Sequence, residues 1–160
     1  MPESALANPI HPLGVGEVVL RVADVHRSIS FYRDVLGFPL IRVLHNAIAF
    51  IRVADGVAGH TQIIGLFDRN WASSRAGHAW RGYAPESSTL HHFAVEIKLA
   101  EYEAVLAYLT QQGLEPNTST HAWIGWRSIY VTDPDGHTVE FVCYDGSILD
   151  HASITERPEA

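Results

Sequence analysis

The chain has 160 residues, of which 47% are hydrophobic and 18% charged, and its formal net charge is -7. A chain of this length can bury enough surface for one compact domain or two small fused modules. The negative charge argues against nucleic acid as the main partner, and no apolar run approaches the roughly 20 residues that span a bilayer. We therefore expect a protein that binds a small molecule, and neither nucleic acid nor a membrane.

Cysteine content and the N-terminal residues bear on the compartment. The single cysteine, Cys143, cannot form an internal disulfide, which fits a reducing cytoplasm. The first twelve residues lack both the basic stretch and the apolar stretch of a secretory signal. We expect a cytoplasmic protein.

The first half of the chain is predicted to form a strand, a helix and three more strands. Residues 17–22 are short and rich in β-branched side chains, as is typical of a strand, and Asp24 is placed to cap a helix. Apolar residues then recur at helical spacing up to Gly37, a residue suited to end a helix in a left-handed conformation. The three following strands are predicted at 39–44, 47–53 and 61–68.

The second half repeats this order of elements. Residues 92–97 are strand-like, and 99–112 form an amphipathic pattern that ends at Gly113. The residues Asp133-Pro-Asp-Gly136 are a strong turn signal between the last two strands. The three strands of this half are predicted at 114–118, 127–132 and 137–144.

Equivalent landmarks of the two halves are separated by offsets that agree within one residue. The offset is 75 positions at the start of the first strand, 76 at the end of the helix and 75 in the last strand. Agreement at three independent places indicates a duplication. The landmark pairs are Glu17 with His92, Gly37 with Gly113, and Gly65 with Glu140.

These patterns predict an α+β fold of two tandem βαβββ modules that form a shared, partly open barrel. The first module is assigned to residues 14–68 and the second to 89–146. Residues 69–88 form the loop between them, and 1–13 and 147–160 are tails without a recognisable pattern.

The loop between the modules is long and rich in aromatic residues, among them Trp71, Trp80 and Tyr83. A loop of this length and composition is typical of a lid or of a contact between subunits, and the two alternatives are equally compatible with the sequence. We expect a homodimer.

Three polar residues occupy equivalent positions on the strands of the two modules. Because alternate strand residues face opposite sides, the apolar side chains are expected to pack on the helices, and Glu17, His92 and Glu140 to point into the opposite space. Two carboxylates and an imidazole that converge in a pocket repel one another unless a cation lies between them. The pattern predicts a divalent metal held by these three side chains.

Simpler interpretations stand beside this one. Glu17 can also be interpreted as a solvated carboxylate at a strand end, and Glu140 as a cross-strand ion-pair partner of Arg21 or Arg127.

A second group of candidates lies just before a predicted strand, in the sequence His-Ala-Trp-Ile-Gly-Trp-Arg that ends at Arg127. Aromatic and cationic side chains in close sequence suit a planar or anionic ligand. We assign substrate binding to His121, Trp126 and Arg127.

Two longer patterns are more specific. They are Phe-Tyr-x-x-Val-Leu-Gly, which ends at Gly37, and Asp-Pro-Asp-Gly-x-x-x-Glu, which ends at Glu140. Together with the segments 17–24 and 92–95, they resemble the vicinal oxygen chelate superfamily, which includes glyoxalase I, extradiol dioxygenases, methylmalonyl-CoA epimerase, and the fosfomycin and bleomycin resistance proteins. The resemblance extends over both modules and implies a glyoxalase-like fold.

The resemblance also implies four ligand positions, at the start of the first strand and within the last strand of each module. They map to Glu17, Gly65, His92 and Glu140, with two departures: position 17 holds glutamate where many relatives have histidine, and Gly65 has no side chain. The remaining set of two carboxylates and one imidazole is hard and anionic. We therefore expect Mn2+, Zn2+, Ni2+ or Mg2+ before Fe2+.

The resemblance implies that such a metal would hold neighbouring oxygens of a small oxygen-rich metabolite, with Glu17 or Glu140 as catalytic base. Our first hypothesis is a metal-dependent lyase, isomerase or ring-cleaving dioxygenase. The alternative is a metal-free protein that sequesters a ligand, of the bleomycin-resistance kind. A third hypothesis, a dimer that has lost activity, is suggested by Gly65.

Overall fold

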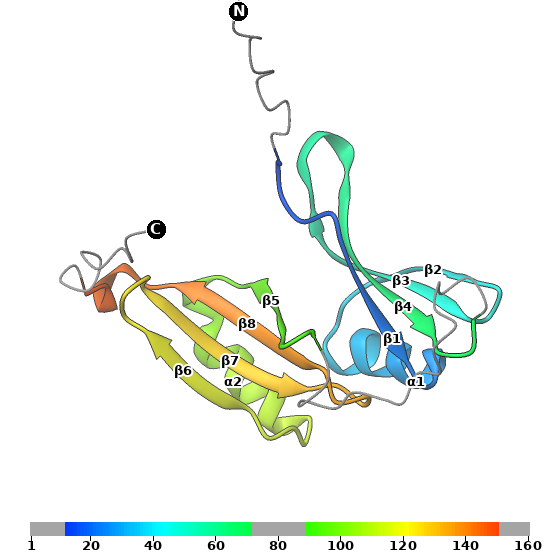
Figure 1. Cartoon of the computed structure of the whole chain (residues 1–160). Helices are drawn as coiled ribbons and strands as arrows, with labels where there is room; N and C mark the ends of the chain where they lie inside the picture. Colours follow the sequence, from blue (N-terminus) through cyan, green and yellow to red (C-terminus); the bar gives the residue numbers. More distant parts are fainter. Residues whose placement is uncertain (1–11, 72–88, 151–160) are drawn as a thin grey trace, which may run out of the picture.

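Figure 1 shows the computed structural model of the chain, which describes residues 12–71 and 89–150. In the first module the elements are β1 (Glu17–Val22), α1 (Val25–Ile29), the π-helical segment η1 (Ser30–Val35), β2 (Leu40–Leu44), β3 (Ile48–Asp55), η2 (Val57–Gly59) and β4 (Thr61–Asp68). In the second they are β5 (Phe93–Glu96), η3 (Leu99–Glu101), α2 (Tyr102–Gln111), β6 (Asn117–His121), β7 (Trp126–Thr132), β8 (Thr138–Tyr144) and η4 (Gly146–Ile148).

Each module contains one four-stranded sheet of the same topology. The order is β1-β4-β3-β2 in the first sheet and β5-β8-β7-β6 in the second, and in both only the first-listed pair is parallel. Val19 pairs with Gly65, and Ala94 pairs with Glu140. The two pairs are related by the offset of 75 that the sequence indicated, so the predicted fold class of two βαβββ modules is confirmed.

The first helix begins and ends where the sequence predicts. The Asp24 carboxylate accepts hydrogen bonds from the backbone N–H groups of His26 and Arg27 at 2.8 and 3.1 Å, and Gly37 has a φ of 75°. The difference lies in the middle, where the chain continues as a π-helix over Ser30–Val35. Apolar spacing does not distinguish these two hydrogen-bond patterns.

The predicted strand at 114–118 is displaced in the structure to Asn117–His121. This strand has the sequence Asn-Thr-Ser-Thr-His, without an apolar alternation. It lies at the edge of the second sheet, and its position is set by antiparallel pairing with β7. Pairing with a neighbour is a tertiary property that the strand's own residues do not encode.

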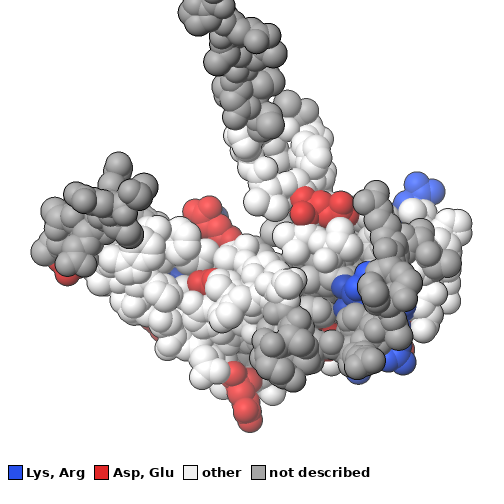
Figure 2. Space-filling view, in the orientation of Figure 1, with Lys and Arg blue, Asp and Glu red and all other residues white. Residues whose placement is uncertain are grey.

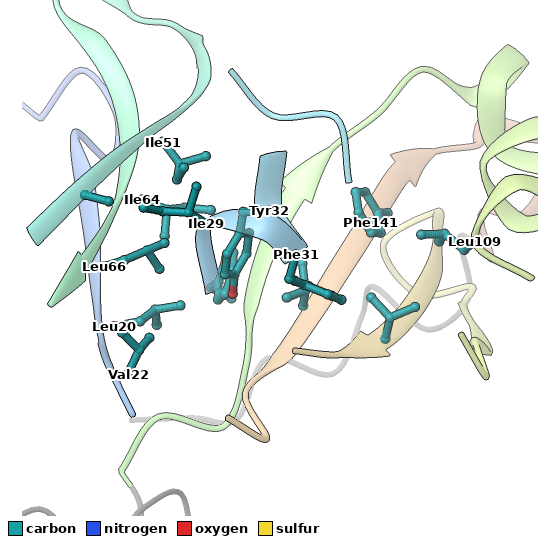
Figure 3. Close-up of a cluster of buried hydrophobic side chains, with 14 of the residues drawn as sticks. Leu20, Val22, Ile29, Phe31, Tyr32, Ile51, Ile64, Leu66, Leu109 and Phe141 are labelled. Carbon is teal, nitrogen blue, oxygen red and sulfur yellow. The ribbon is translucent and has the colours of Figure 1, made fainter. Parts of the chain in front are cut away.

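The first helical segment lies between the two sheets (Figure 3), and the hydrophobic core surrounds it. Tyr32 is fully buried and faces Ile64 and Leu66 of the first sheet, whereas Phe31 is directed toward Phe141 of β8. One cluster of buried side chains contains residues of both modules. The core thus packs against one face of each sheet and leaves the opposite faces open.

The turn between β7 and β8 binds the first module as well as closing a hairpin. The side chain of Asp133 is fully buried and accepts hydrogen bonds from the Tyr32 hydroxyl at 2.9 Å and from Nδ1 of His137 at 3.0 Å. The backbone N–H groups of Asp135 and His137 donate to its other oxygen at 2.9 and 2.8 Å. A buried carboxylate with this many donors is fully satisfied.

Asp135 of the same turn forms a second connection to the first module. Its carboxylate accepts hydrogen bonds from Arg27 at 2.6 Å, from the Ser28 hydroxyl at 3.2 Å and from the backbone N–H of Ala23 at 3.1 Å. The turn signal read from the sequence therefore also holds the two modules together.

Most of the predicted tails 1–13 and 147–160, and most of the inter-module loop 69–88 with Trp80 and Tyr83, lie outside the described residues. Within the described ranges, no helix is both long enough and apolar enough to cross a membrane.

Candidate functional site

The open face of the second sheet carries the side chains that strand alternation directed away from the helices. Glu140 projects from β8 on this face, and Tyr130 lies opposite it on the neighbouring β7. His92 immediately precedes β5, the other neighbour of β8. Three polar side chains from three adjacent segments therefore meet at one place on the sheet.

His92 and Glu140 form the closest pair of this face. His92 Nε2 lies 3.0 Å from Glu140 Oε2, and the side chains are 37% and 4% exposed. A carboxylate that is almost completely buried needs a proton donor or a cation. Glu140 meets this requirement through an imidazole whose other side is accessible to solvent.

His91 contacts the same imidazole. The Nδ1 atoms of His91 and His92 are 2.6 Å apart, and the rings meet edge to face. The strand begins only at Phe93, so alternation does not turn His91 away as the sequence would suggest. Contact at Nδ1 leaves Nε2 of His92 as the nitrogen that faces Glu140, and metal-binding histidines commonly have such a partner on the other ring nitrogen.

Glu17 belongs to the first sheet, where it lies over Gly65. A Cβ atom at position 65 would be 2.9 Å from Glu17 Oε1, 3.2 Å from Val19 and 3.3 Å from Phe67. The carboxylate of Glu17 thus occupies the space that a side chain at position 65 would enter. Because Gly65 has no side chain, the Glu17 carboxylate is accessible to a ligand that approaches from outside this sheet.

Glu17 does not join His92 and Glu140 within one chain. Among residues 12–71 and 89–150, no group of three or more His, Cys, Asp or Glu side chains is close enough to hold a metal ion. The physical reason is the shared core, which packs against the inner face of each sheet. The three predicted ligands are consequently divided between two open faces, with one on the first sheet and two on the second.

The predicted substrate-binding residues are divided by strand alternation. His121 and Trp126 pair across β6 and β7 on the open face, and His121 Nε2 lies 3.1 Å from the Tyr130 hydroxyl. Arg127 faces the helix instead, with its guanidinium 4.1 Å from the centre of the Tyr102 ring and an ion pair to Glu103. The structure therefore brings two of the three to the face of Glu140 and places Arg127 on the other side.

Tyr130 and His91 are polar residues of this face that sequence reasoning did not select. Burial is the largest cause that raises the pKa of the Tyr130 hydroxyl, and the nearby Glu140 raises it further. Strand alternation was sufficient to identify Tyr130, because Tyr130 and Trp126 are four residues apart on one strand and therefore face the same side. No sequence pattern identified His91, because the direction of its side chain depends on where β5 begins.

The donor set fits a divalent cation. If His92 donates its Nδ1 hydrogen to His91, an unprotonated Nε2 lies 3.0 Å from a carboxylate oxygen, and two lone pairs at that distance repel. A cation between the two atoms removes the repulsion and binds to both. Imidazole and carboxylate are ligands of Zn2+, Mn2+, Ni2+ and Fe2+.

Two βαβββ modules, with acidic and imidazole side chains on their open faces, define the class of this protein. The chain belongs to the glyoxalase/bleomycin resistance protein/dioxygenase superfamily, whose family model matches residues 14–141.

Particular relatives have different enzymatic activities. The chain is 30% identical over 133 residues to the lactoylglutathione lyase of Haemophilus influenzae, over 78% of this chain and 87% of the relative. It is 25% identical over 154 residues to the iron-dependent extradiol dioxygenase of Rhodococcus jostii, over 92% of this chain but only 48% of the relative. The crystal structure of lactoylglutathione lyase from Agrobacterium tumefaciens superposes with a TM-score of 0.61 and 26% identity, over 85% of this chain and 96% of that chain.

Proposed function

We propose that this protein is a metal-dependent enzyme whose metal is held by His92 and Glu140 of one copy and Glu17 of a second copy. The observation that carries the proposal is the buried Glu140 carboxylate, 3.0 Å from an imidazole nitrogen on an open face. The iron dependence of the dioxygenase relative supports a metal at such a site. Mn2+, Zn2+, Ni2+, Mg2+ and Fe2+ are the candidate ions.

The division of ligands between two sheets supports a homodimer. The open face of the first sheet exposes 49% of Val19 and leaves Phe50 and Phe67 only half-buried. The second sheet exposes 39% of Trp126 and 56% of Tyr144. Because solvent-exposed apolar groups favour burial, we propose that the first sheet of one copy packs against the second sheet of the other.

Charge favours the same pairing. Residues 14–68 contain five basic and five acidic residues, whereas residues 89–146 contain two basic and eight acidic ones. Figure 2 shows that most of the Lys and Arg side chains visible on this face of the molecule gather around the first module. Contact between unlike modules of two copies brings Arg21 and Arg42, on the open face of the first sheet, toward the acidic module.

The chemistry of this site is proton transfer beside a bound oxygen. When bound, the metal supplies positive charge that stabilises negative charge on the substrate. Glu17 is exposed and lies at the open edge of the first sheet, which supports a second role in which it leaves the metal and accepts a proton as general base. Glu140 is held by His92, and its main role is to bind the metal. His121 and Trp126 provide a polar and an aromatic surface for the substrate on the same face.

The reaction belongs to the lyase, isomerase or ring-cleaving dioxygenase classes, and the substrate is a small oxygen-rich metabolite. Two of these classes occur in the relatives, as lactoylglutathione lyase and as extradiol dioxygenase. A site with only three protein ligands leaves positions for two substrate oxygens, which suits any of the three reactions.

Metal analysis tests the proposal directly. Protein purified without added metal should contain a divalent transition metal, or should bind Mn2+, Zn2+ or Ni2+ and melt at a higher temperature when it does. His92→Ala combined with Glu140→Ala should abolish binding, whereas Glu96→Gln, at the far end of the strand that follows His92, should leave it unchanged. Wild-type protein with less than about 0.1 equivalent of metal and no stabilisation by added metal would contradict the enzyme and favour a ligand-sequestering protein.

Mixed dimers test the contribution of the second copy. Glu17→Ala and His92→Ala chains, each defective alone, should regain one intact site per dimer when they are unfolded together and refolded. Tight metal binding should return to about half of the mixed dimers' sites, since the second site carries both substitutions. If the mixture binds no better than either variant, Glu17 and His92 do not act across a dimer interface.

A further inference from the structure

The Glu140 carboxylate is buried in the middle of the sheet face opposite the helices. Glu140 is 3% exposed and Val142 beside it on this face is 8% exposed, whereas Thr138 and Tyr144, at the two ends of the strand, are half-buried and exposed. His92 is too exposed, at 37%, to provide all of this cover. The remaining cover comes from the neighbouring strand, where Tyr130 is the residue directly opposite Glu140.

We propose that Tyr130 is a positioning residue, whose hydroxyl holds the Glu140 carboxylate in the orientation that binds the metal and is itself held by His121. This inference rests on the proposed metal site and adds a role for two residues that would not touch the metal.

The geometry connects four side chains in a row. The Tyr130 ring meets the His92 ring edge to face, with 6.1 Å between centroids, so the tyrosine borders both proposed ligands. Its hydroxyl lies 3.1 Å from His121 Nε2. The sequence of contacts is therefore His121, Tyr130, Glu140 and His92, across β6, β7, β8 and the start of β5.

The order of the hydrogen bonds follows from the donors available. An ionised carboxylate only accepts, and a tyrosine hydroxyl has one hydrogen to donate. A hydrogen bond to a charged acceptor is the stronger one, so the hydroxyl donates to Glu140. The Tyr130 oxygen then accepts from His121, whose Nε2 must carry the hydrogen. Burial is the largest cause that raises the pKa of Tyr130 and a Ser128 hydrogen bond lowers it, while the charge and hydrogen bond of Glu140 raise it further, which agrees with this contact.

Orientation matters because a carboxylate has two oxygens. Glu140 Oε2 faces His92, and a hydrogen bond from Tyr130 prevents rotation of the carboxylate away from this direction. Loss of an outer hydrogen bond to a ligand typically weakens metal affinity by about 10- to 100-fold. A residue that contacts substrate alone has no such effect on affinity for the metal.

The test measures Mn2+ affinity by calorimetry and the visible absorption spectrum of the Co2+-loaded protein, with no substrate present. Tyr130→Phe keeps the ring and removes the hydroxyl, and is expected to weaken Mn2+ binding about 10-fold and to alter the Co2+ spectrum. Tyr144→Phe is the matched control, because Tyr144 lies on the same face and is 56% exposed. This control should bind both metals as wild type does.

His121 provides a second variant that leaves the half-buried Tyr130 intact. His121→Ala is expected to weaken Mn2+ binding by about threefold, and to have no further effect in the Tyr130→Phe background, because the two residues act in series. Additive effects of the two substitutions would overturn the serial arrangement.

The outcomes separate this inference from the metal site itself. Wild-type Mn2+ affinity and an unchanged Co2+ spectrum in Tyr130→Phe, with metal binding still dependent on His92 and Glu140, overturn the positioning role alone. Absence of metal binding in the wild-type protein overturns both proposals. Reduced affinity in Tyr130→Phe, with the melting temperature of the metal-free protein unchanged, supports the positioning role.

Discussion

The last strands of the two modules, β4 and β8, are equivalent in the fold but carry different residues at the equivalent position, a glycine in β4 and a glutamate in β8. Gly65 of β4 pairs with Val19, and Glu140 of β8 pairs with Ala94, at equivalent registers. At the first site the strand has no side chain, and the carboxylate of Glu17 fills the space above it. At the second site the strand provides the carboxylate itself. Each module thus has one carboxylate at this position of its last strand: Glu17 reaches over Gly65 from the first strand, and Glu140 belongs to the last strand itself.

The ends of the β3–β4 and β7–β8 hairpins both carry aspartates, but the aspartates differ in burial. Asp55, at the end of β3, has a side chain that is 83% exposed and pairs with Arg52 of its own strand. Asp133 and Asp135, after β7, have side chains that are 0% and 2% exposed and bind residues of the other module. Similar residues therefore have different roles because of what packs on them. One hairpin end is a solvated surface, and the other connects the modules.

The largest expected effect is on this connection. Asp133→Ala leaves the Tyr32 hydroxyl, His137 and two backbone N–H groups without their acceptor. Removal of one partner from a buried network typically costs about 3–5 kcal/mol, so we expect a melting temperature lower by roughly 10 °C. Asp55→Ala, at the exposed hairpin end, should change the stability by less than about 0.5 kcal/mol. Equal losses in thermal unfolding of the two variants would show that burial does not distinguish the two ends.

The same carboxylate should make stability depend on pH. Burial by itself would raise the pKa of Asp133, but the hydrogen bond and charge of His137, with the Tyr32 hydrogen bond, lower it overall. Since the pKa in the folded state lies below the unfolded value of about 3.9, this stabilisation is fully present above that pH. It is lost as pH falls through the folded pKa.

Urea unfolding between pH 6 and pH 2 measures this dependence. The difference in unfolding free energy between wild type and Asp133→Asn should be constant above about pH 4 and shrink below it. A difference that stays constant down to pH 2 would mean that folding does not lower the pKa of Asp133.

An intermediate effect is expected at Gly65. Gly65→Ala places a methyl group 2.9 Å from Glu17 Oε1, so the flexible carboxylate must move while the fold is preserved. We expect the proposed Mn2+ site to weaken about 10-fold, with a stability change below about 1 kcal/mol. Gly14→Ala is the matched control, because its nearest contact is Gln62 at 3.3 Å. Calorimetric titration that shows equal affinity in both variants would exclude Glu17 as a ligand in its present position.

The smallest effect is expected at Arg127. Arg127→Met removes a guanidinium that lies over the Tyr102 ring and an ion pair to Glu103. The expected loss of stability is about 0.5–1 kcal/mol, with no change in metal or substrate affinity, because the side chain is on the helix face of the sheet. Thermal unfolding and Mn2+ titration measure the two quantities. A large loss of Mn2+ affinity with unchanged stability would contradict this assignment of Arg127 to the helix face.

Much of the fold was predictable because it rests on local patterns. The β1 strand lies at Glu17–Val22 as the sequence predicts, Asp24 caps α1, and Gly37 and Gly113 have the positive φ values that end the helices. Strand β6 was displaced because its polar residues carry no periodicity of their own. The alternation of β8 correctly directed Glu140 away from the helices, but did not reveal that Tyr130 and His92 would bury it.

The sequence by itself determined the duplication, the strand faces and the residues that carry chemistry. These depend on periodicity and offset, which are properties of the chain. Only the tertiary structure decided which of those residues meet. His92 and Glu140 are neighbours because β5 and β8 are adjacent, whereas Glu17 is kept in the other sheet because a common core packs against the inner faces of both. Distance between strands is set by packing, and packing involves residues that no single segment contains.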